Sequence, residues 1–523
     1  MEMVWAWPEI LFSILITTFL IFVIYLLSRM INEAQTAPVN WPVIGMLAGV
    51  IANRHRLLDY TTANLRKSGC TYVFKGPWFS GMNFIVTCDP ANANHIFNTH
   101  FADYPKGDDF KEFFDPLGDG IFNVDDDLWR HQRRMAQAGL HNTKFPSLIA
   151  KWSKEKVVST VLPLLDAMGS SDRVLDLHDM FMRLTFDITC HLVFGIDPCS
   201  LALDFPTVPI VAALEEIEEV ILLRHIEPMF WWKLKRALGI GKEKGVVMAK
   251  EVARLFTAQC IAKKKREQHP QDQNSSDLLS LYMDLDLDNH NNIESGLVDY
   301  FRSDEFLHDA MLTFLFAGRD TIGSGLSWFF HVLMANPEVE KKILKELSRV
   351  RWLLCEEHSS WWKMFEPDEI DDLVYLHAAL CEAMRLFPPV PLNHKSASKE
   401  DVLPSGQRVQ PGTMIIYSIY SAGRMERVWG KDCLQFKPER WISDDGKLKR
   451  EPSYKFLAFH CGPRMCLGKD MAFTQMKIIV ASIIYNFHVE AIKGHIVEPK
   501  LSVTLQMKNG LMVNVRKREK ITY

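Results

Sequence analysis

The sequence lacks the cysteine patterns that would indicate a disulfide framework or a zinc site. Its 10 cysteines are scattered along 523 residues, with no CxxC pair and no zinc-like spacing, so we expect reduced thiols. An excess of either charge is also missing, because the net charge is −4, and this gives no general reason to expect a nucleic-acid partner. With 48% hydrophobic and 24% charged residues, the composition excludes a disordered chain.

Linkers and repeats are missing as well. A chain of this length would usually hold about three or four domains, yet no Gly/Ser-rich linker, low-complexity tract or internal repeat divides it. We therefore predict one large domain over residues 51–523, a size that suits a fold built around a buried cofactor.

One long hydrophobic run is present, near the N-terminus. Residues 10–28 form an uninterrupted uncharged stretch, and as a helix they would span roughly 28 Å, close to the hydrocarbon thickness of a bilayer. No Lys or Arg precedes the run and Arg29 follows it, so the positive-inside rule leaves the rest of the chain in the cytosol. We predict a transmembrane anchor over residues 1–32. A buried core helix is the alternative interpretation.

The segment after the anchor is proline-rich. Pro38 and Pro42 interrupt any helical pattern there, because proline lacks the backbone donor and restricts the residue before it. We interpret residues 33–50 as a stiff hinge between the membrane and the globular part.

Helical periodicity dominates the rest of the chain. It extends over residues 111–387, and a further apolar helical pattern covers residues 471–489. Strand-like composition is confined to residues 72–86, 414–419 and 501–515. The predicted fold class is mainly α with a small β part.

The most informative stretch is residues 459–468, which reads Phe-His-Cys-Gly-Pro-Arg-Met-Cys-Leu-Gly. Cys466 precedes a helical pattern, where unpaired backbone N–H groups and the helix dipole would stabilise a thiolate. Gly462 and Gly468 allow a tight turn and a close approach to a flat ligand. Arg464 can neutralise a carboxylate, and Phe459 offers a ring beside the sulfur. A haem iron with a cysteine axial ligand needs this combination.

The spacing F-x-x-G-x-R-x-C-x-G resembles the haem-binding loop of the cytochrome P-450 family. The resemblance implies that Cys466 is the axial, metal-binding ligand of a haem b and that the other fixed residues of the loop help to bind this cofactor. Cys461 occupies a variable position of the motif, and we interpret it as an ordinary small apolar residue. A buried free cysteine in a glycine loop is the alternative to a haem ligand.

A second motif lies at residues 317–321, Ala-Gly-Arg-Asp-Thr, inside a long apolar helical pattern that begins near Asp304. The adjacent Ala and Gly would open space against the backbone, and Asp320 and Thr321 could hydrogen-bond O2 and pass protons to it. The motif resembles the oxygen-activation motif of the family, so we predict that Thr321 and Asp320 are catalytic. Ordinary packing of Gly and Thr is the alternative. Buried Arg319 and Asp320 must in any case be paired.

A third motif concerns the haem propionates. Trp129 and Arg133 are one helical turn apart and resemble the W-x-x-x-R pair of the family, whose ring nitrogen and guanidinium hold a propionate. An exposed basic helix face is the alternative. The basic pair His394 and Lys395 is a further candidate for a propionate contact.

A fourth motif is structural. Glu382 and Arg385 can pair across one helical turn, and Arg440 supplies a second guanidinium. These three residues resemble the buried Glu/Arg/Arg cluster of the family, so we do not count them as catalytic.

The four motifs occur in the order of the family along essentially all of the chain beyond the anchor. The resemblance implies the P-450 fold, O2 as co-substrate and electrons from NADPH–cytochrome P-450 reductase, with cytochrome b5 as a further candidate donor. It also implies a single-pass protein of the endoplasmic reticulum membrane with a cytosol-facing catalytic domain.

The substrate is a hydrophobic small molecule whose class stays open. Residues 117–123 and 391–395 resemble the plant branch that hydroxylates fatty acids and alkanes, and especially its family ninety-six, which includes midchain alkane hydroxylases. The same sub-branch holds enzymes that couple phenol rings in alkaloid synthesis. Our first hypothesis is hydroxylation of a long-chain alkane or fatty acyl chain, and the rival is intramolecular phenol coupling of an aromatic alkaloid precursor. A haem isomerase or binder that does not use O2 is a third hypothesis, which the motif at residues 317–321 opposes.

The distribution of charged and aromatic residues predicts two interaction surfaces. Residues 424–477 hold 12 Lys/Arg against 7 Asp/Glu, which suits docking of an acidic flavoprotein on the thiolate side of the haem. Residues 228–236 mix aromatic side chains with cations, a composition typical of a segment at a membrane interface. A buried aromatic loop is the alternative for this segment.

Overall fold

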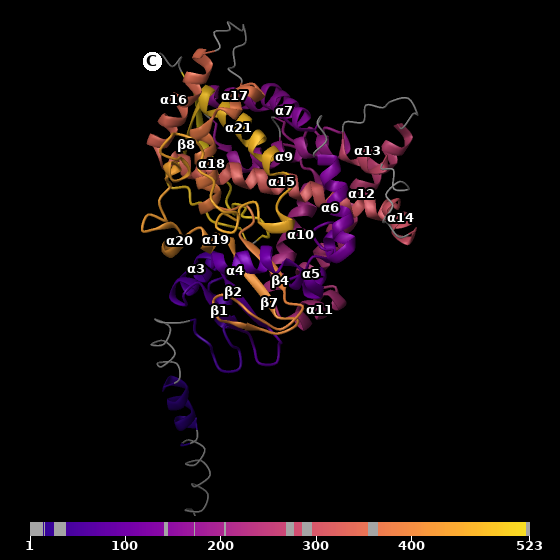
Figure 1. The fold of residues 1–523 in the computed structure, drawn as a ribbon, viewed down its shortest axis with the longest axis vertical. Helices are drawn as coiled ribbons and strands as arrows, with labels where there is room; N and C mark the ends of the chain where they lie inside the picture. Colours follow the sequence, from indigo (N-terminus) through magenta and orange to yellow (C-terminus); the bar gives the residue numbers. More distant parts are fainter. Residues whose placement is uncertain are drawn as a thin grey trace, which may run out of the picture.

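Helices make up most of the molecule. The computed structural model describes residues 14, 16–25, 38–140, 145–171, 173–202, 205–267, 277–284, 295–353, 365–500 and 502–518. A four-stranded sheet lies at the lower end of the body in Figure 1, and the helices occupy the remainder. The prediction of a mainly α fold with a small β part is confirmed.

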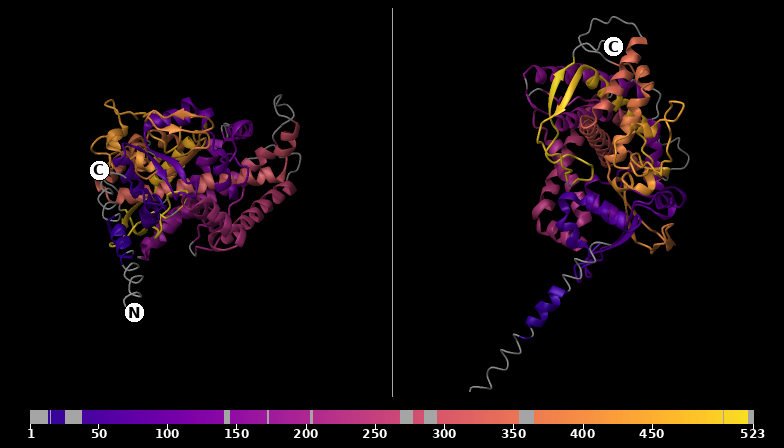
Figure 2. Two further views of the ribbon diagram at one scale, coloured as in Figure 1. Left: turned by 90° about the horizontal axis from the view of Figure 1, so that it is seen from below. Right: turned by 90° about the vertical axis from the view of Figure 1, so that its left-hand side faces the viewer.

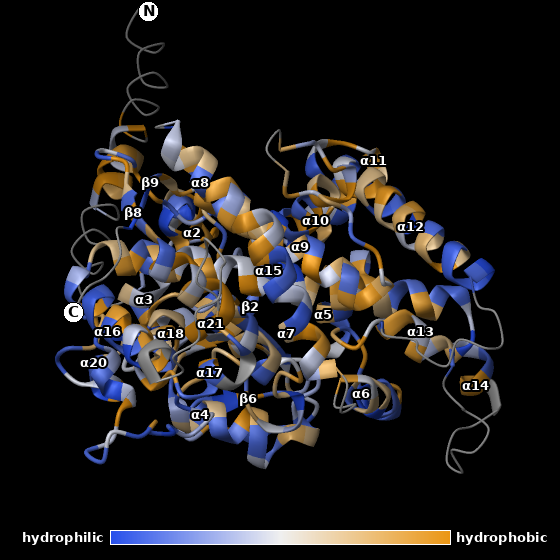
Figure 3. Ribbon diagram, turned by 90° about the horizontal axis from the view of Figure 1, so that it is seen from above, coloured by the Kyte–Doolittle hydropathy of each residue, from blue (hydrophilic) through white to orange (hydrophobic). Residues whose placement is uncertain are grey.

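The long helix α15 (Asp304–Met334) runs through the centre of the helical part. It begins where the sequence predicted, because Ser303 Oγ accepts a hydrogen bond of 3.1 Å from the backbone N–H of Phe306 and caps the first turn. Nearly all of α15 is buried, and it packs against α9 (Leu177–Phe194) and the C-terminal helix α21 (Lys469–Asn486). Figure 3 shows α15 in the middle of the view with other helices around it.

The remaining helices and helical turns connect these central elements. The helices are α2 (Leu47–Ala52), α3 (Leu57–Lys67), α4 (Pro90–Asn94), α5 (Gly107–Phe113), α6 (Asp126–Leu140), α7 (Phe145–Lys156), α8 (Leu162–Ser170), α10 (Pro209–Ile226), α11 (Met229–Leu238), α12 (Gly241–Glu267), α13 (Leu278–Met283), α14 (Ser295–Phe301), α16 (Pro337–Leu353), α17 (Pro367–Asp371), α18 (Val374–Leu386), α19 (Ile419–Ala422) and α20 (Glu426–Trp429). The short 3-10 and π-helical turns are η1 (Arg54–Arg56), η2 (His95–Thr99), η3 (Phe101–Asp103), η4 (Asp115–Leu117), η5 (Val157–Val161), η6 (Pro438–Trp441) and η7 (Gly462–Arg464).

The main sheet has the strand order β1-β2-β7-β4. Its strands are β1 (Thr71–Lys75), β2 (Asn83–Thr87), β7 (Met414–Ser418) and β4 (Leu392–Ser396). The pair β1–β2 is antiparallel, β2–β7 is parallel and β7–β4 is antiparallel. The predicted strands within residues 72–86 and 414–419 are therefore confirmed, and they pair with each other across the sequence.

Two small sheets complete the β part. One has the order β3-β9-β8, from β3 (Leu175–Asp176), β9 (Met512–Lys517) and β8 (Phe487–Ala491), and the other pairs β5 (Asp401–Val402) with β6 (Arg408–Val409).

Two sequence-based boundaries were wrong at the C-terminal end. The helix predicted over residues 471–489 ends at Asn486, because residues 487–491 pair with β9 as the antiparallel strand β8. The strand predicted over residues 501–515 is limited to its last part, since β9 begins at Met512. Residues 502–506 instead run as a loop between α10 and α15, where the backbone N–H of Leu505 donates to Pro389 O over 2.8 Å. Leu501 lies outside the described residues.

The N-terminal predictions fall partly outside the described residues, which omit 1–13, 15 and 26–37. Residues 16–25 are helical and stand off from the body in Figure 2. Their large apolar side chains are solvent-exposed, for example Phe19 at 66% and Ile24 at 62%. Within the part of the chain that the structure describes, no helix is long and apolar enough to cross a bilayer. Residues 38–45 form a turn closed by pairing of Trp41 with Gly45, so this stretch is not helical, as predicted.

Candidate active site

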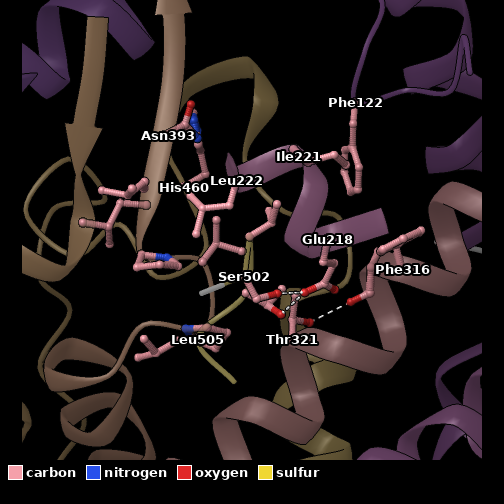
Figure 4. A pocket seen from close by; sticks show the side chains of 18 of the residues that line it. Phe122, Glu218, Ile221, Leu222, Phe316, Thr321, Asn393, His460, Ser502 and Leu505 are labelled. Atoms are coloured by element: carbon pink, nitrogen blue, oxygen red, sulfur yellow. Dashed lines mark hydrogen bonds between the residues drawn. The ribbon is translucent and has the colours of Figure 1, made fainter. Parts of the chain in front are cut away.

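A cavity of about 780 Å³ lies between the sheet end of the molecule and the central helices. Its wall is mostly apolar and comes from α6, α10, α15, β4, the loop before α21 and the loop at residues 502–505. Figure 4 shows how labelled side chains from these elements converge, including Glu218 and Leu222 from α10, Thr321 from α15 and Leu505 from the C-terminal loop. The cavity brings together Cys466, Arg464, Trp129, Arg133, Phe459, Gly468 and Thr321 from the sequence-based prediction.

The loop of residues 459–468 presents Cys466 to this cavity. The backbone N–H of Cys466 donates to Phe459 O over 2.9 Å and closes the loop. At Gly462 the backbone has φ +67°, and a Cβ there would lie 1.8 Å from Phe97 O, so only glycine fits against η2. Cys461 is 1% exposed and packs in the core beside the sheet. Of the two cysteines in this loop, Cys466 is therefore the one available to a ligand in the cavity.

The sequence suggested that the start of a helix would stabilise a thiolate at Cys466. The structure shows further influences on its charge state. Helix α21 begins at Lys469, three residues later. Burial raises the pKa of the Cys466 thiol, and the backbone N–H of Gly468 and the nearby Arg133 oppose this shift. The protein by itself thus favours a neutral thiol, and a bound metal ion would supply the charge that holds the thiolate.

Arg464, Trp129 and Arg133 meet at one side of the cavity. Arg464 donates to Asp125 Oδ1 over 2.6 Å and to Val124 O over 2.7 Å, and its Nε has no partner within the described residues. The guanidinium of Arg133 donates to Met465 O over 2.5 Å, directly beside Cys466. Trp129 is 7% exposed and lines the cavity, whereas Arg130 and Arg134 on the same helix are exposed.

Two lysines join this cation cluster. Lys395 is 1% exposed and donates to Tyr104 O over 2.6 Å, and burial together with the nearby Arg464 lowers its pKa to about 7. Burial also holds the pKa of Lys106 well below its usual value, and Lys395 and Arg464 add to this shift. Asp125 is the one carboxylate that opposes these shifts. Basic side chains therefore outnumber the nearby carboxylates of Asp125 and Asp126, and the propionates of a haem would supply further negative charge.

Sequence reasoning found Lys395 but missed Lys106, because nothing in its local sequence separates it from other surface lysines. His394, the other half of the basic pair, lies elsewhere in the wall. Its Nδ1 is 3.3 Å from His225 Nε2, and His225 Nδ1 is 2.8 Å from Ile221 O. Since the carbonyl can only accept, His225 donates from Nδ1. His225 then accepts at Nε2 from His394 Nδ1, which leaves His394 Nε2 as an acceptor.

Thr321 and Asp320 point in different directions from α15. Thr321 lines the cavity and donates its hydroxyl hydrogen to Ala317 O over 2.7 Å. Asp320 is 0% exposed, is not part of the cavity wall and accepts from Arg319 over 2.7 Å. The expectation that buried Arg319 and Asp320 have partners is confirmed, since they pair with each other and Arg319 also contacts Glu215. The helix brings the hydroxyl, but not the carboxylate, to the cavity.

Asp320 belongs to a buried polar network. Burial raises the pKa of Asp320 well above its usual value, and Arg319 opposes this shift. Arg319 also contacts Glu215 over 3.4 Å, and Glu215 pairs with Lys500 over 2.9 Å, so the network reaches partly exposed side chains. Ala317 and Gly318 both line the cavity, and a Cβ on Gly318 would lie 2.6 Å from Thr189 of α9. Gly318 therefore serves close helix packing.

Glu218 is a cavity residue that sequence reasoning missed. It lies on α10, is 1% exposed and lines the cavity. Thr504 donates to Glu218 Oε2 over 2.6 Å and Gln506 donates to it over 3.2 Å, and Ser502 donates to the same oxygen. Gln506 also reaches Asp320 Oδ1 over 3.4 Å, which links the carboxylate of α10 to the network of α15.

The Glu/Arg/Arg cluster is present as the sequence predicted. Arg385 donates to both oxygens of Glu382 over 2.7 and 2.8 Å, and Arg440 reaches Glu382 Oε1 over 3.3 Å. Trp441 Nε1 adds a bond of 2.8 Å. Glu382 is 0% exposed, so this cluster joins α18 to η6 in the interior.

The Cys466 thiol could bind a metal, and the basic side chains could bind carboxylates. A planar cofactor that carries a metal and two carboxylates would satisfy both. These two requirements define a haem-thiolate oxidoreductase. The chain belongs to the cytochrome P450 family, whose model matches residues 36–515. This family binds haem with an axial cysteine thiolate on the iron, so haem is the cofactor of the protein, O2 and a redox partner are its co-reactants, and small molecules are its substrates.

Similar proteins from plants carry different names. The chain is 45% identical to noroxomaritidine synthase from Narcissus aff. pseudonarcissus MK-2014 over 514 residues, which cover 98% of this chain and 97% of the relative. It is 39% identical to alkane hydroxylase MAH1 from Arabidopsis thaliana over 508 residues, 96% of this chain and 98% of the relative. It is 41% identical to cytochrome P450 86B1 from Arabidopsis thaliana over 514 residues, 97% of this chain and 90% of the relative.

Proposed function

We propose that the protein is a membrane-anchored P450 that oxidises a hydrophobic small molecule with O2 and electrons from NADPH–cytochrome P-450 reductase. The observation that carries the proposal is that Cys466 and Thr321 line one mostly apolar cavity. Cys466 is the axial ligand of haem b, and the haem supplies the oxidation chemistry when bound.

The residues around the cavity have separate roles in this proposal. The haem propionates would be held by Arg464, Arg133, Trp129, Lys106 and Lys395. Phe459, Gly462 and Gly468 shape the cysteine loop. Thr321 holds and moves a proton at its Oγ1 beside the substrate, while Asp320 acts from behind the wall through the network with Arg319.

The first substrate candidate is a long-chain alkane or fatty acyl chain, which would be hydroxylated. The apolar wall supports it, as does the relative named for alkane hydroxylation. The side chains of Phe122, Ile221, Leu222 and Phe316, which Figure 4 labels, give this wall its apolar character.

The second candidate is intramolecular phenol coupling of an aromatic alkaloid precursor, in which no oxygen enters the product. The relative named noroxomaritidine synthase supports it through its 45% identity over 98% of the chain.

The membrane part of the proposal rests on exposed apolar side chains. We propose that residues 1–32 anchor the chain once through the endoplasmic reticulum membrane, that residues 33–50 form the hinge, and that residues 51–523 face the cytosol. Beyond the exposed side chains of residues 16–25, Phe230 and Trp231 of α11 are 49% and 46% exposed, and the ring of Phe230 lies 6.2 Å from that of Phe79. This patch would rest on the membrane surface.

The test combines the carbon monoxide spectrum of the haem with an assay for incorporation of isotope-labelled oxygen into the product. Microsomes containing the protein and the reductase are given NADPH and isotopically labelled O2, with an alkane in one assay and a phenolic amine in the other. A haem-thiolate carbon monoxide spectrum and a labelled alcohol would support hydroxylation, and an unlabelled coupled product would support the second candidate. A protein without the carbon monoxide spectrum would contradict the whole proposal.

A further inference from the structure

The loop of residues 118–124 lies between η4 and α6 and supplies two side chains of the cavity wall. These side chains belong to Ile121 and Phe122. Figure 4 shows the Phe122 side chain pointing into the pocket beside Ile221 of α10. Part of the surface that a substrate would touch therefore comes from a segment that is neither helix nor strand. The contacts that hold this loop determine the shape of that surface.

An acidic side chain of α15 holds the first part of the loop. Asp309 Oδ2 accepts a hydrogen bond of 2.7 Å from the backbone N–H of Asp119. Asp309 is 8% exposed and is not part of the cavity wall. Burial raises the pKa of this carboxyl to about 6, and the bond from Asp119 opposes the shift, so the carboxylate is mostly charged at neutral pH. A hydrogen bond to a charged acceptor is roughly twice as strong as one between neutral groups.

Two glycines allow the loop to approach α15 this closely. Gly118 has φ +62°, and a Cβ there would lie 2.1 Å from Asp309 Oδ1. A Cβ on Gly120 would lie 2.0 Å from Oγ1 of Thr313, one turn further along α15. Another residue at either position would push the loop away from the helix. The contact with α15 therefore explains both glycines of the stretch 117–123.

The second part of the loop is bound to the cysteine loop. Arg464 donates to Val124 O over 2.7 Å and to Ile121 O over 3.4 Å. Gln132 of α6 adds a bond of 2.8 Å to Asp119 O. The wall side chains of the loop thus lie between the contact with α15 and the contact with Arg464, a residue of the proposed cofactor site. Their position relative to the cofactor depends on both contacts.

We propose that Asp309 is a positioning residue that selects substrates with a long apolar part by holding the 118–124 loop on α15. This inference rests on the proposed function and deepens it, because it assigns substrate selection to a residue outside the cavity wall. The carboxylate fixes the backbone of Asp119, and the loop then holds Ile121 and Phe122 where they contact the apolar part of a substrate. Without this bond the substrate would have to order the loop on binding, which lowers its affinity.

The experiment compares a short and a long probe that bind the haem iron through the same kind of nitrogen. The probes are 1-methylimidazole and 1-octylimidazole, and both are mostly uncharged at slightly alkaline pH. Each is titrated into the haem-loaded, full-length protein, and the change in haem absorbance gives its affinity. The ratio of the two affinities measures the contribution of the apolar wall separately from changes at the iron.

Asp309→Ala should lower the preference for the long probe. We expect the affinity ratio to fall at least about fivefold, which corresponds to losing the burial of roughly one methylene group. The affinity for 1-methylimidazole should stay close to that of the wild-type protein. Gly118→Ala disturbs the same contact from the loop side and should lower the ratio in the same direction.

Two further variants show whether Asp309 acts through the loop. Phe122→Ala removes a wall side chain and should itself lower the ratio. Asp309→Ala should then have a smaller effect in the Phe122→Ala background than in the wild-type protein, since residues that act through each other are not additive. Glu305→Ala is the matched control, because Glu305 is an exposed acid one turn earlier on α15 and lies outside the cavity wall. It should leave the ratio unchanged.

The outcomes separate this inference from the proposed function. An unchanged ratio in an Asp309→Ala protein that keeps the carbon monoxide spectrum overturns the role of Asp309. An equal effect of Asp309→Ala with and without Phe122, or an equal fall in Glu305→Ala, also overturns it. If Asp309→Ala loses its haem, Gly118→Ala decides, and an unchanged ratio in that variant overturns the inference. A wild-type protein without the carbon monoxide spectrum contradicts the proposed function instead.

Discussion

The guanidinium of Arg464 lies over the indole ring of Trp129, with its carbon 4.6 Å from the ring centroid. This contact joins the cysteine loop to α6, and the bonds of Arg464 to Asp125 and Val124 fix the guanidinium from the other side. The cation is therefore held in place by the protein alone. A propionate would meet a donor that has already lost its side-chain freedom, which favours tight cofactor binding.

The two cysteines of the loop should behave differently. Cys466→Ala removes the thiol that opens to the cavity, so we expect loss of the haem-thiolate carbon monoxide spectrum. Cys461→Ala removes a small side chain from the core beside the sheet, which is 1% exposed, and the spectrum should persist. Absorbance spectra of both variants, expressed side by side, check this. Loss of the spectrum in both, or only in Cys461→Ala, would refute the assignment of Cys466.

Thr321→Ala tests the proton-handling role of the hydroxyl. The variant should bind haem and substrate as before, because among the described residues the Thr321 hydroxyl bonds to Ala317 O of its own helix and to no other group. Less product should form per NADPH consumed, and more hydrogen peroxide should be released. General acid–base contributions are typically about 10²–10⁴-fold, although water in the enlarged space can replace part of the hydroxyl. Product, NADPH and peroxide are assayed together, and unchanged coupling would mean that Thr321 is a packing residue.

Glu382→Gln should destabilise the folded protein. It removes the carboxylate that compensates the buried Arg385, whereas Arg440 keeps its ion pair with Asp432 at 3.0 Å. Removing one partner of a buried pair costs about 3–5 kcal/mol. We expect a lower midpoint of thermal unfolding and faster loss of the haem spectrum. Glu439→Gln is the control, since Glu439 pairs with Lys342 near the surface and such pairs contribute about 1 kcal/mol or less. Equal effects of the two substitutions would contradict a buried structural cluster.

Lys395 should make the stability of the haem-free chain depend on pH. Its pKa is lowered from 10.5 to about 7 in the fold, so between these pH values the unfolded chain binds more protons and the free energy of unfolding rises with pH. Lys395→Met should remove this dependence, stabilise the haem-free chain at neutral pH and speed transfer of haem to an acceptor protein. Lys399→Met, at a side chain that is 61% exposed, is the control. Slower haem transfer from Lys395→Met would argue against a propionate contact.

Deletion of residues 1–28 should leave a haem domain that still gives the carbon monoxide spectrum. Much of this shortened protein should move to the soluble fraction, but not all of it, because Phe230 and Trp231 remain exposed on α11. Carbonate extraction of membranes checks the difference. Resistance to carbonate that is the same with and without residues 1–28 would refute the anchor.

The predictions that held depend on local signals. Apolar periodicity and a serine cap act within a few residues. They predicted that α15 begins near Asp304 and that residues 317–321 lie inside this helix. The pairing of Glu382 with Arg385 follows from their spacing on one helix. The sequence also distinguished Cys466 from Cys461, because only Cys466 occupies a fixed position of the loop motif.

The features that were missed depend on contacts between distant segments. Glu218 belongs to a run that also contains Glu215, Glu216 and Glu219, and only the packing of α10 against the C-terminal loop selects one of the four. The loop at residues 502–506 has strand-like composition, but its backbone turns into the centre of the molecule, where Leu505 O accepts from Ser324 and Trp328. The sequence pattern of α10 or of residues 502–506 alone could therefore not predict the contact between them.

The position of that loop has an evolutionary consequence. Ser502, Thr504 and Gln506 set the surroundings of the Glu218 carboxylate, yet they lie outside the cysteine loop and outside the Glu382 cluster. Substitutions at these three positions can change the cavity wall while the cysteine loop and the Glu382 cluster stay unaltered. The surroundings of this carboxylate can therefore diverge in evolution independently of the residues that hold the cofactor.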